Sequence, residues 1–377
     1  MNFALTEEQE ALRRTARTFA EKEIAPLAAE CDETNEYPVG LLKRMARLGY
    51  FGLKFPAAYD GGAGGNLDAA IVFEELAAVS AGITLGVYCH VILALTAIAR
   101  IGSEAQKQRY LIPGIQGEKI GAFGSTEAGA GSDITAIATR AVRDGDSYVL
   151  NGAKLFCTNS PIADFIVLSA VTAPETGGLS LFAVDRGTPG LNVGRRMKTL
   201  GMHPAQTAEV VLDNVRVPEE NRLGAEHRGV PNMLMALTEG RIIAAAFTVG
   251  IARAAFEAAR RYALERVQFG QPIARHQVIA HRLADMDTEI QAARLLTHHA
   301  AWLADTGRSF VKEASQAKVF ASEAASRITA QALHLQGAYG YMLESSAQRY
   351  YRDTPVLALG EGTSEILRNV IAKQLGL

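Results

Sequence analysis

Near its C-terminus the chain reads Pro355-Val-Leu-Ala-Leu-Gly-Glu-Gly-Thr-Ser-Glu-Ile-Leu-Arg368. An apolar run leads to a single carboxylate, Glu361, which stands between two glycines. Glycine carries no side chain and permits backbone angles that other residues avoid, so this carboxyl can approach a flat ligand closely. Burial in an apolar pocket would raise its pKa, as a general base working near neutrality requires. The stretch predicts a catalytic base, and the competing interpretation is a turn with a solvated glutamate.

The rest of the chain divides into three parts by its hydrophobic pattern. Residues 1–118 read as helices, residues 119–225 as short strands spaced by turns, and residues 226–377 as long helices. Short strands separated by turns suggest a small antiparallel barrel or sandwich. We therefore expect a mostly α protein with a central β-barrel between an N-terminal helical domain and a C-terminal bundle.

Several local signals mark the ends of these elements. Thr6 and Gln9 form a predicted capping box, and Thr363 offers an N-cap to a closing helix. Asn151-Gly152 predicts a type I′ hairpin turn, and Asp144-Gly145 is a second turn signal. Long C-terminal helices are expected near residues 230–266, 275–305 and 310–336.

The composition limits the class of protein. The chain has 377 residues, a formal net charge of −2 and 48% hydrophobic residues. A near-neutral charge without a basic block argues against nucleic-acid partners and against an electrostatic membrane anchor. The three cysteines, Cys31, Cys89 and Cys157, are far apart and lack metal-ligand spacing, which indicates buried thiols in a reducing compartment and no metal site.

The sequence also predicts a cytoplasmic protein without a membrane segment. The N-terminal residues 1–10 are acidic where a signal peptide would be basic and then apolar. The most apolar helical segment, residues 83–99, carries Thr84, His90 and Thr96 and is short for a membrane span. We expect a buried helix there.

Four further segments combine small, hydroxyl, aromatic and cationic residues. Gly121–Asp133 is a loop whose backbone amides can face a ligand, and Phe156-Cys-Thr-Asn159 places an aromatic ring and a hydroxyl at a strand end. Arg266–Ile273 joins two long helices and offers an arginine for phosphate and a phenylalanine for stacking. His334–Tyr341 has the small residues that let backbone lie against an extended ligand. Each segment taken alone is more often structural than functional.

Taken together and in this order, the segments resemble the acyl-CoA dehydrogenase family of flavoproteins. The resemblance covers essentially the whole chain and rests on Thr126-Glu-x-Gly-x-Gly-Ser-Asp133, Arg266-x-x-Phe-Gly-x-Pro-Ile273 and Glu361-Gly-Thr-Ser-Glu-Ile366. It implies an α-helical domain, a β-barrel and a four-helix bundle. It also implies FAD as the cofactor, an acyl thioester as substrate, an electron-transfer flavoprotein or other acceptor as partner, and a homotetramer or dimer.

The resemblance assigns roles to individual residues. Glu361 would be the catalytic base that removes the α proton while the β hydrogen leaves as hydride. Substrate contacts would come from Ser132, Thr238, Arg241 and Gly362. Flavin contacts would come from Ser125, Thr126, Gly131, Ser132, Phe156, Thr158, Thr363 and Glu365, and contacts to the cofactor of a neighbouring subunit from Arg266, Gln268, Phe269, Gln277, His334, Gly337 and Ala338.

A second carboxylate, Glu239, competes for the role of base. Some relatives place the base immediately before the arginine that corresponds to Arg241, and here Gly240 fills that position. Glu239 points roughly 100° away from Gly240 on an ideal helix. We therefore favour Glu361 and expect Glu239 to be a solvated helical residue.

Some residues depart from the family pattern and leave the substrate carrier open. Thr238 stands where many CoA-using members have aspartate, His334 where the family has glutamine, and Ser346-Ala-Gln348 where it usually has Pro-Val/Met-Glu. Two segments, 158–164 and 186–193, look like relatives that oxidise acyl or aminoacyl groups tethered to carrier proteins. The alternatives to an acyl-CoA dehydrogenase are therefore a carrier-linked dehydrogenase, a flavin oxidase on the same scaffold, and a binding protein with a decayed site.

The acyl pocket is the least defined part of the prediction. Five residues can either line such a pocket or pack in the core: Tyr88, His90, Leu93, Met235 and Leu357.

Overall fold

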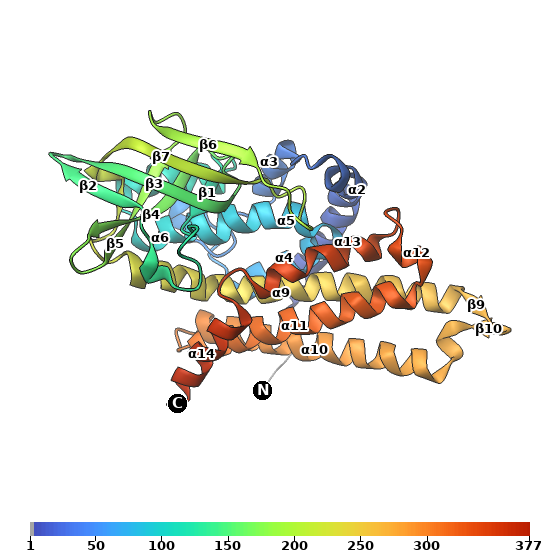
Figure 1. Ribbon diagram of the computed structural model, residues 1–377. Helices are drawn as coiled ribbons and strands as arrows, with labels where there is room; N and C mark the ends of the chain where they lie inside the picture. Colours follow the sequence, from blue (N-terminus) through green and yellow to red (C-terminus); the bar gives the residue numbers. More distant parts are fainter. Residues whose placement is uncertain (1–3) are drawn as a thin grey trace.

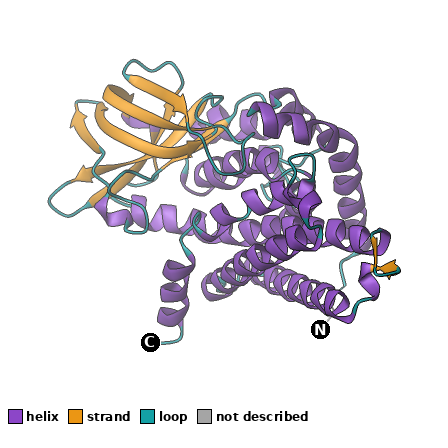
Figure 2. Ribbon diagram, turned by 45° about the vertical axis from the view of Figure 1, so that its right-hand side comes forward, coloured by secondary structure: helices purple, strands orange, loops and turns teal. Residues whose placement is uncertain are grey.

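The computed structural model describes residues 4–377. One β-sheet lies at one end of the molecule, and long helices run beneath it and beyond it (Figures 1 and 2). Helix α5 (Ala81–Tyr88), the π-helix η3 (Cys89–Leu95) and helix α6 (Thr96–Ile101) lie between the sheet and helix α9 (Gly229–Glu265). This middle layer joins the sheet to the C-terminal helices through one continuous hydrophobic core.

The N-terminal part is helical, as predicted. The capping box is confirmed, because the Thr6 side chain accepts from the Gln9 N–H and the Gln9 side chain from the Thr6 N–H. Helix α3 (Val39–Arg47) ends before Gly49, which takes a positive φ of 79°. The other N-terminal elements are α1 (Glu7–Phe19), η1 (Ala20–Ile24), α2 (Ala25–Thr34), η2 (Ala57–Tyr59), α4 (Asn66–Val79), α7 (Glu104–Gln106), η4 (Lys107–Leu111) and α8 (Ile112–Ile115).

Two helical stretches are long and apolar enough to cross a membrane. They are Ala81–Ile101 and Gly229–Glu265, and 94% and 72% of their most apolar windows are buried inside the fold. Core helices of a folded domain have the same composition, because they are covered by protein on most sides. The predicted buried helix at residues 83–99 is confirmed.

The predicted closed antiparallel barrel is not confirmed. The sheet is mixed and open, with the order β6-β7-β3-β2-β4-β5-β8 and with β1 paired to β4. Strand β1 runs parallel to β4, with Gly121 opposite Phe165, and the end strands β6 and β8 do not pair with each other. The strands are β1 (Gly121–Gly124), β2 (Arg140–Asp144), β3 (Ser147–Thr158), β4 (Phe165–Ala173), β5 (Gly178–Asp185), β6 (Leu191–Arg196), β7 (Thr207–Pro218) and β8 (Arg222–Leu223).

The predicted hairpin turn at Asn151-Gly152 is also wrong. Strand β3 continues through both residues, and its pairing with β7 shifts register between Leu150 and Gly152. A Cβ atom at Gly152 would lie 2.4 Å from Oγ1 of Thr139, so the glycine admits a neighbouring segment at a bulge. The turn between β2 and β3 falls instead at the other predicted signal, where Gly145 takes a φ of 66°.

Three long helices dominate the C-terminal part. Helix α9 packs against α4 on one side and against α10 (Gln277–Asp305) and α11 (Val311–Leu335) on the other. The fourth place of the expected bundle is taken by short helices that pack on α11, namely α13 and α14. The remaining elements are β9 (Val267–Gln268), β10 (Gln271–Pro272), η5 (Ile134–Ala136), η6 (Glu219–Asn221), η7 (Ile273–Arg275), α12 (Ala338–Tyr341), α13 (Ser346–Asp353), η8 (Pro355–Ala358) and α14 (Ser364–Gln374). The division of the chain at residues 118 and 225 stays a prediction.

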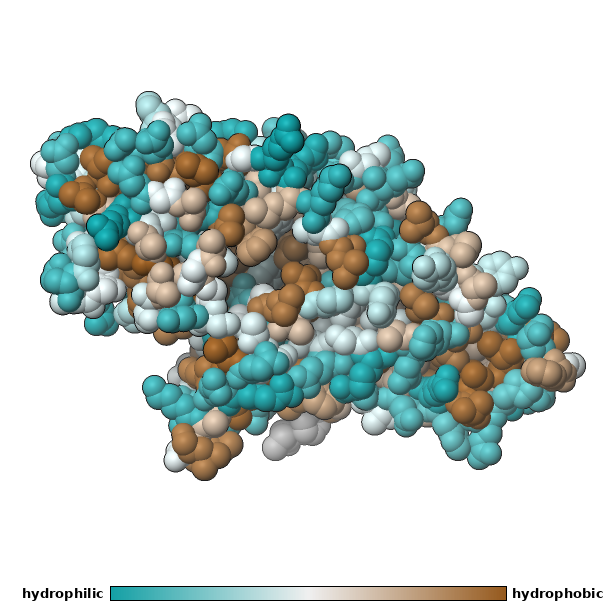
Figure 3. Space-filling model, in the orientation of Figure 1, coloured by the Kyte–Doolittle hydropathy of each residue, from teal (hydrophilic) through white to brown (hydrophobic). Residues whose placement is uncertain are grey.

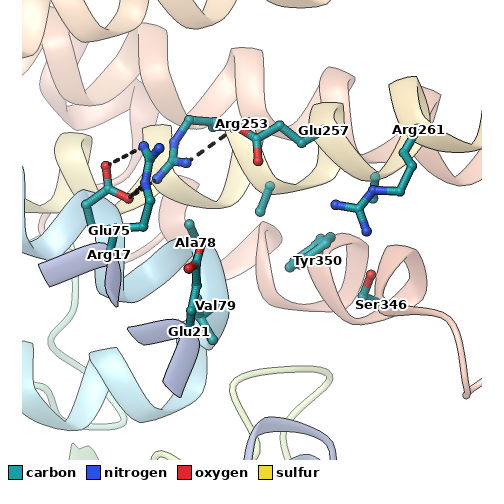
Figure 4. Close-up of a pocket in the computed structure, with 12 residues that line it drawn as sticks. Arg17, Glu21, Glu75, Ala78, Val79, Arg253, Glu257, Arg261, Ser346 and Tyr350 are labelled. Carbon is teal, nitrogen blue, oxygen red and sulfur yellow. Dashed lines mark hydrogen bonds and ion pairs between the residues drawn. The ribbon is translucent and has the colours of Figure 1, made fainter. Parts of the chain in front are cut away.

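A buried carboxylate fastens the N-terminal helices to α9. Glu75 lies on α4 at the edge of a cavity of about 200 Å³, and its side chain is 2% exposed. Arg17 of α1 donates to it at 3.0 Å and Arg253 of α9 at 2.7 Å (Figure 4). The cavity is lined by charged residues from these helices, and its lining includes none of the predicted site residues.

Glu75→Gln is expected to lower the free energy of unfolding by about 2–3 kcal/mol, because it leaves two cations without their shared anion. Urea unfolding of the two proteins measures the difference. Glu257→Gln is the matched control, since Glu257 lines the same cavity, is 48% exposed and lies 3.5 Å from Arg253. Its loss should change stability by less than about 0.5 kcal/mol. Equal effects of the two substitutions would contradict this account.

Candidate active site

Glu361 lies in the turn between η8 and α14 and has a strained backbone. Its φ is 59°, in the left-handed region that a residue with a side chain rarely adopts, and Gly362 follows with a φ of 94°. Gly360 keeps an ordinary φ, so only one of the two flanking glycines is required by the backbone. Such strain persists where surrounding contacts fix the conformation, and it is often found at functional sites.

Three consecutive carbonyls of this turn are held by other parts of the chain. Arg241 on α9 donates from Nε to the Glu361 carbonyl at 3.2 Å, and Lys318 on α11 donates from Nζ to the Gly362 carbonyl at 2.7 Å. The Thr363 carbonyl accepts from Leu367, and the Thr363 side chain caps α14 as predicted. The backbone N–H of Glu361, in contrast, has no acceptor among residues 4–377. It remains available to a ligand.

The Glu361 carboxylate points at Gly240 of α9. A Cβ atom at Gly240 would lie 3.0 Å from Glu361 Oε2 and 2.9 Å from the Tyr88 hydroxyl oxygen. The Tyr88 hydroxyl donates to the Gly240 carbonyl at 3.0 Å. Oε2 is shielded from solvent and has no hydrogen-bond partner in the described chain, residues 4–377. The carboxylate thus occupies the space that a side chain at position 240 would fill.

Burial gives this carboxylate the pKa of a base that works near neutrality. Desolvation raises the pKa of Glu361 to about 7, against the opposing effects of Arg241, Tyr88 and Lys318. Part of the residue is exposed, whereas Oε2 is shielded. This environment differs from that of a solvated glutamate in a surface turn.

Glu239 is in a different environment, and the expectation that it is solvated is wrong. Its side chain is buried and forms ion pairs with Lys54 at 2.8 Å and with Arg100. Burial alone would raise its pKa, but these two cations outweigh it and hold the pKa below the ordinary value. A carboxylate engaged by two cations, on a different side of α9 from Gly240, is poorly placed to accept a proton from a substrate.

Four of the predicted flavin-binding residues lie together at the end of the sheet that faces α9. Ser125 donates to the sulfur of Met233 on α9 at 2.9 Å, and Thr126 accepts at its carbonyl from the N–H of Leu155 at 2.8 Å. Phe156 is 63% exposed and has a φ of 56°, so its ring projects from β3. Thr158 shares a hydrogen bond with Thr207 at 3.0 Å.

Cys89 links this group to the turn that carries Glu361. Burial, the nearby charge of Glu361 and the Cys157 thiol raise the pKa of the Cys89 thiol, whereas a hydrogen bond with Thr158 lowers it. Glu361 and Thr158 therefore both lie near Cys89. Figure 3 shows a hollow between the sheet and the C-terminal helices, beside the segment that joins α13 to α14, with hydrophobic residues on its rim.

The predicted substrate residues fall into two kinds. Ser132 is exposed on the loop after β1, next to Gly131, which is predicted as a cofactor contact and is also exposed. Arg241 is buried and donates to the Glu361 carbonyl and to the Thr238 hydroxyl at 3.4 Å, while Thr238 donates to the Leu234 carbonyl. In this chain Arg241 and Thr238 are therefore engaged in holding α9 and the turn of Glu361.

A second group of predicted cofactor residues is not brought to Glu361. Arg266 follows α9, about 26 residues and roughly 40 Å along the helix from Gly240. Figure 1 shows the β9–β10 hairpin and α12 at the end of the long helices opposite to α14. The exposed members of this group are Arg266, Gln268, Phe269, Gln277, His334, Gly337 and Ala338, and Glu365 is exposed beside Thr363 at the start of α14.

His90 is a core histidine and does not line an acyl pocket. Its Nδ1 accepts from the Gly121 N–H at 2.9 Å, so its Nε2 carries the proton and donates to the Gly114 carbonyl at 3.0 Å. Complete burial lowers its pKa to about 4. Leu93 and Leu357 pack in the same core, Met235 is exposed, and Tyr88 borders the Glu361 carboxylate.

Lys318 is the residue that sequence reasoning missed. It lies on the buried face of α11 among Ala314, Ala317 and Ala321. A lysine on a face of small apolar residues is unusual, and that pattern is a signal that the sequence does contain. Within residues 4–377 no cluster of three histidine, cysteine or acidic side chains is arranged to hold a metal ion.

Comparisons with known proteins match the whole chain. The acyl-CoA dehydrogenase N-terminal domain matches residues 6–118, the middle domain residues 122–215 and the C-terminal domain residues 227–376. The chain is 43% identical to the probable acyl-CoA dehydrogenase YngJ of Bacillus subtilis, covering 100% of both chains. It is 39% identical to the caffeyl-CoA reductase-Etf complex subunit CarC of Acetobacterium woodii, covering 98% of each.

Solved structures agree. Butyryl-CoA dehydrogenase from Megasphaera elsdenii has a TM-score of 0.98 and 38% identity, covering 100% of both chains. The prolyl acyl carrier protein oxidase AnaB has a TM-score of 0.96 and 31% identity over 99% of this chain and 100% of its own. PigA with FAD and proline has a TM-score of 0.97 and 29% identity over 100% of both. The chain therefore belongs to the acyl-CoA dehydrogenase family of oxidoreductases, which act on CH–CH bonds.

Proposed function

We propose that the protein is an FAD-dependent dehydrogenase that introduces an α,β double bond into an acyl-CoA, with Glu361 as the base. The observation that carries this proposal is the Glu361 carboxylate, whose Oε2 is shielded and without a partner in the described chain. Its pKa is raised to about 7, chiefly by burial. A carboxyl in this state can take a weakly acidic proton and return it without a large change in pH.

The turn also supplies a hydrogen-bond donor for the substrate. The α C–H of a thioester becomes acidic when negative charge on the carbonyl oxygen is stabilised. The Glu361 N–H has no acceptor within residues 4–377, and the three carbonyls after it are fixed. We assign this N–H to the thioester oxygen, while the carboxylate of the same residue removes the α proton.

The residues at this end of the sheet fit a flavin. The exposed Phe156 ring, the Thr158 and Ser125 hydroxyls and the backbone after Thr126 provide stacking surface and hydrogen-bond groups. Thr363 and Glu365 would add contacts from the start of α14. When bound, FAD supplies the acceptor for the hydride that leaves Cβ. Reoxidation by an electron-transfer flavoprotein is supported by the likeness to a subunit of an Etf complex.

A second copy of the chain would complete the cofactor site. The exposed group at the far end of the long helices includes Phe269, which is 93% exposed and has a φ of 53°. An aromatic ring so fully exposed beside Arg266 is suited to cover a nucleotide held by another subunit. We propose that Arg266, Gln268, Phe269, Gln277, His334, Gly337 and Ala338 contact FAD across a subunit interface of a tetramer or dimer.

The acyl group of the substrate can be carried by free CoA or by a carrier protein, and an experiment distinguishes the two. Both curated relatives described above are named for CoA chemistry and are more similar to the chain than the carrier-protein oxidase is. We therefore propose free acyl-CoA. Purified protein should be yellow and should bleach anaerobically with butyryl-CoA or another acyl-CoA. Bleaching only by carrier-tethered acyl groups would replace CoA by a carrier, and rapid peroxide formation without an electron-transfer partner would indicate an oxidase. Failure to bind FAD at all would contradict the proposal.

The pH dependence of the reaction follows from the pKa of Glu361. The base must be ionised, so kcat/KM should rise with pH through an acidic limb near the pKa of about 7. At about pH 5 only roughly one molecule in 100 would carry the ionised base, so kcat/KM should be about 100-fold below its plateau. Steady-state rates in matched ionic strength measure the limb. A limb near the ordinary glutamate value of 4.5 would contradict the burial of this carboxylate.

A further inference from the structure

Lys318 is a buried lysine whose charge has no direct anionic partner. It lies on α11, its residue is 2% exposed, and its Nζ donates to the Gly362 carbonyl at 2.7 Å. In the part of the chain from residue 4 to residue 377 it forms no ion pair within 4.0 Å. Lysine is seldom buried without a paired anion, because removing an ammonium group from water is costly. A function that uses the charge would explain why a lysine stands at this position.

Lys318 and Arg241 hold the turn of Glu361 from two sides. Arg241 belongs to α9 and binds the Glu361 carbonyl, while Lys318 belongs to α11 and binds the next carbonyl, that of Gly362. These two hydrogen bonds fix the carbonyl of Glu361, whose φ is 59°, and the carbonyl of the residue that follows it. Without the Lys318 bond the Gly362 carbonyl loses the only donor it has among residues 4–377, and the strained residue before it can relax.

Charged and titratable groups face the Glu361 carboxylate from four elements. They are Tyr88 of α5, Cys89 of η3, Arg241 of α9 and Lys318 of α11. Lys318 itself faces Arg241, Glu361, Glu365 of α14 and Glu323 of its own helix. Burial lowers the pKa of Lys318 to about 8, with the nearby carboxylates opposing that effect. Arg241 and Lys318 are thus the two cations that favour the ionised form of the base.

We propose that Lys318 is a positioning residue for the reaction, which fixes the turn of Glu361 through the Gly362 carbonyl and supplies a positive charge that keeps the base ionised near neutrality. This inference rests on the proposed function of Glu361 as base. A purely structural lysine would anchor α14 and change stability alone, whereas a positioning lysine also changes how the base titrates.

The test compares Lys318→Met with the wild-type flavin-bound enzyme. Methionine has a similar length but no charge and no donor, so kcat above the acidic limb should fall about 10- to 100-fold through misplacement of the base. The limb itself should move to higher pH by about one unit, because an opposite charge no longer favours the carboxylate. Lys318→Arg keeps the charge and should return the limb toward the wild-type pH. Lys312→Met is the control on the same helix, since Lys312 is partly exposed and pairs with its neighbour Glu313.

A second readout does not depend on turnover. Infrared titration of the flavin-bound protein without substrate follows the protonated carboxyl band of Glu361, with Glu361→Gln used to assign the band. Lys318→Met should shift this titration in the same direction as the limb. Where Lys318→Met does not fold, Lys318→Gln carries the prediction of the shifted titration, because it removes the charge and keeps a donor.

The inference would be overturned if the variant without the lysine charge kept the wild-type acidic limb in its pH profile and showed no shift in the titration of the carboxyl band. This holds even if the variant is less stable. That result would leave the role of Glu361 intact, since Glu361→Gln tests it separately. An active Glu361→Gln would instead remove the proposed function, while the infrared titration would still show whether Lys318 acts on the carboxyl.

Discussion

Replacement of Glu361 by glutamine is expected to lower kcat for acyl-CoA oxidation by about 10⁴-fold, while the protein stays folded and keeps its flavin. Glutamine has nearly the same shape but cannot accept the α proton. The two cations that hold the turn bind backbone carbonyls, so their contacts do not depend on the carboxylate. The loss should therefore appear in the chemical step, with little change in the affinity for substrate.

Anaerobic stopped-flow bleaching of the flavin by butyryl-CoA measures this loss directly. Glu239→Gln is the matched control, because Glu239 is a buried carboxylate immediately before Gly240. It should destabilise the protein, since Lys54 and Arg100 lose their partner, but the bleaching rate should stay within about tenfold of wild type. A fast Glu361→Gln enzyme would exclude Glu361 as the base, and a larger loss in Glu239→Gln would assign the base to Glu239.

The second large effect is expected from a single methyl group. Gly240→Ala would place a Cβ atom 3.0 Å from Glu361 Oε2 and 2.9 Å from the Tyr88 hydroxyl. Real Cβ atoms seldom approach so closely, so the two neighbours must shift, and we expect the carboxylate to be displaced. A displacement of about 1 Å at a reacting group costs roughly 100-fold in rate, so kcat should fall by about that factor.

A crystal structure and the rate of flavin bleaching together test the effect of Gly240→Ala. Gly40→Ala is the control, because Gly40 lies on α3 with no atom within 4 Å of the added Cβ. That substitution should leave both rate and fold unchanged. A Gly240→Ala enzyme with wild-type kcat would show that the base does not occupy the space in front of Gly240 during the reaction.

The same contact gives a physical reason for glycine at position 240. The Cβ direction of residue 240 and the carboxylate of residue 361 converge on one space. A side chain at position 240 would enter this space from α9. Under the function proposed above, glycine at position 240 leaves room for a base supplied from position 361.

Much of the helical framework follows from local signals in the sequence. The Thr6 capping box and the Thr363 N-cap are determined by residues within one turn, and the structure has both. The shape of the sheet could not be predicted from local signals, because it depends on which strands pair. Strand β1 joins parallel to β4, more than 40 residues later, and no residue of Gly121–Gly124 records that choice. Gly152 is likewise explained by a close approach of Thr139, which the local Asn-Gly pattern does not reveal.

In the candidate site too, features set by neighbouring residues could be predicted, and contacts between residues distant in the sequence could not. Glu361, its glycine neighbours and the helix cap are contiguous, so the sequence predicts that they lie together. The ion pairs of Glu239 require Lys54 and Arg100, which are distant in the sequence, and its burial was therefore not predictable. Lys318 contacts Gly362 from a different helix, and only its unusual place among alanines marks it in the sequence.

The measurement that tests the central claim most directly is exchange of the substrate α proton with solvent. Flavin-bound enzyme is incubated anaerobically in D₂O with butyryl-CoA, and proton NMR follows the loss of signal at the α carbon. The wild-type and Glu239→Gln enzymes should both exchange this proton, and Glu361→Gln should not. Exchange by Glu361→Gln at the wild-type rate would mean that another group removes the proton, and the assignment of Glu361 as the base would be wrong.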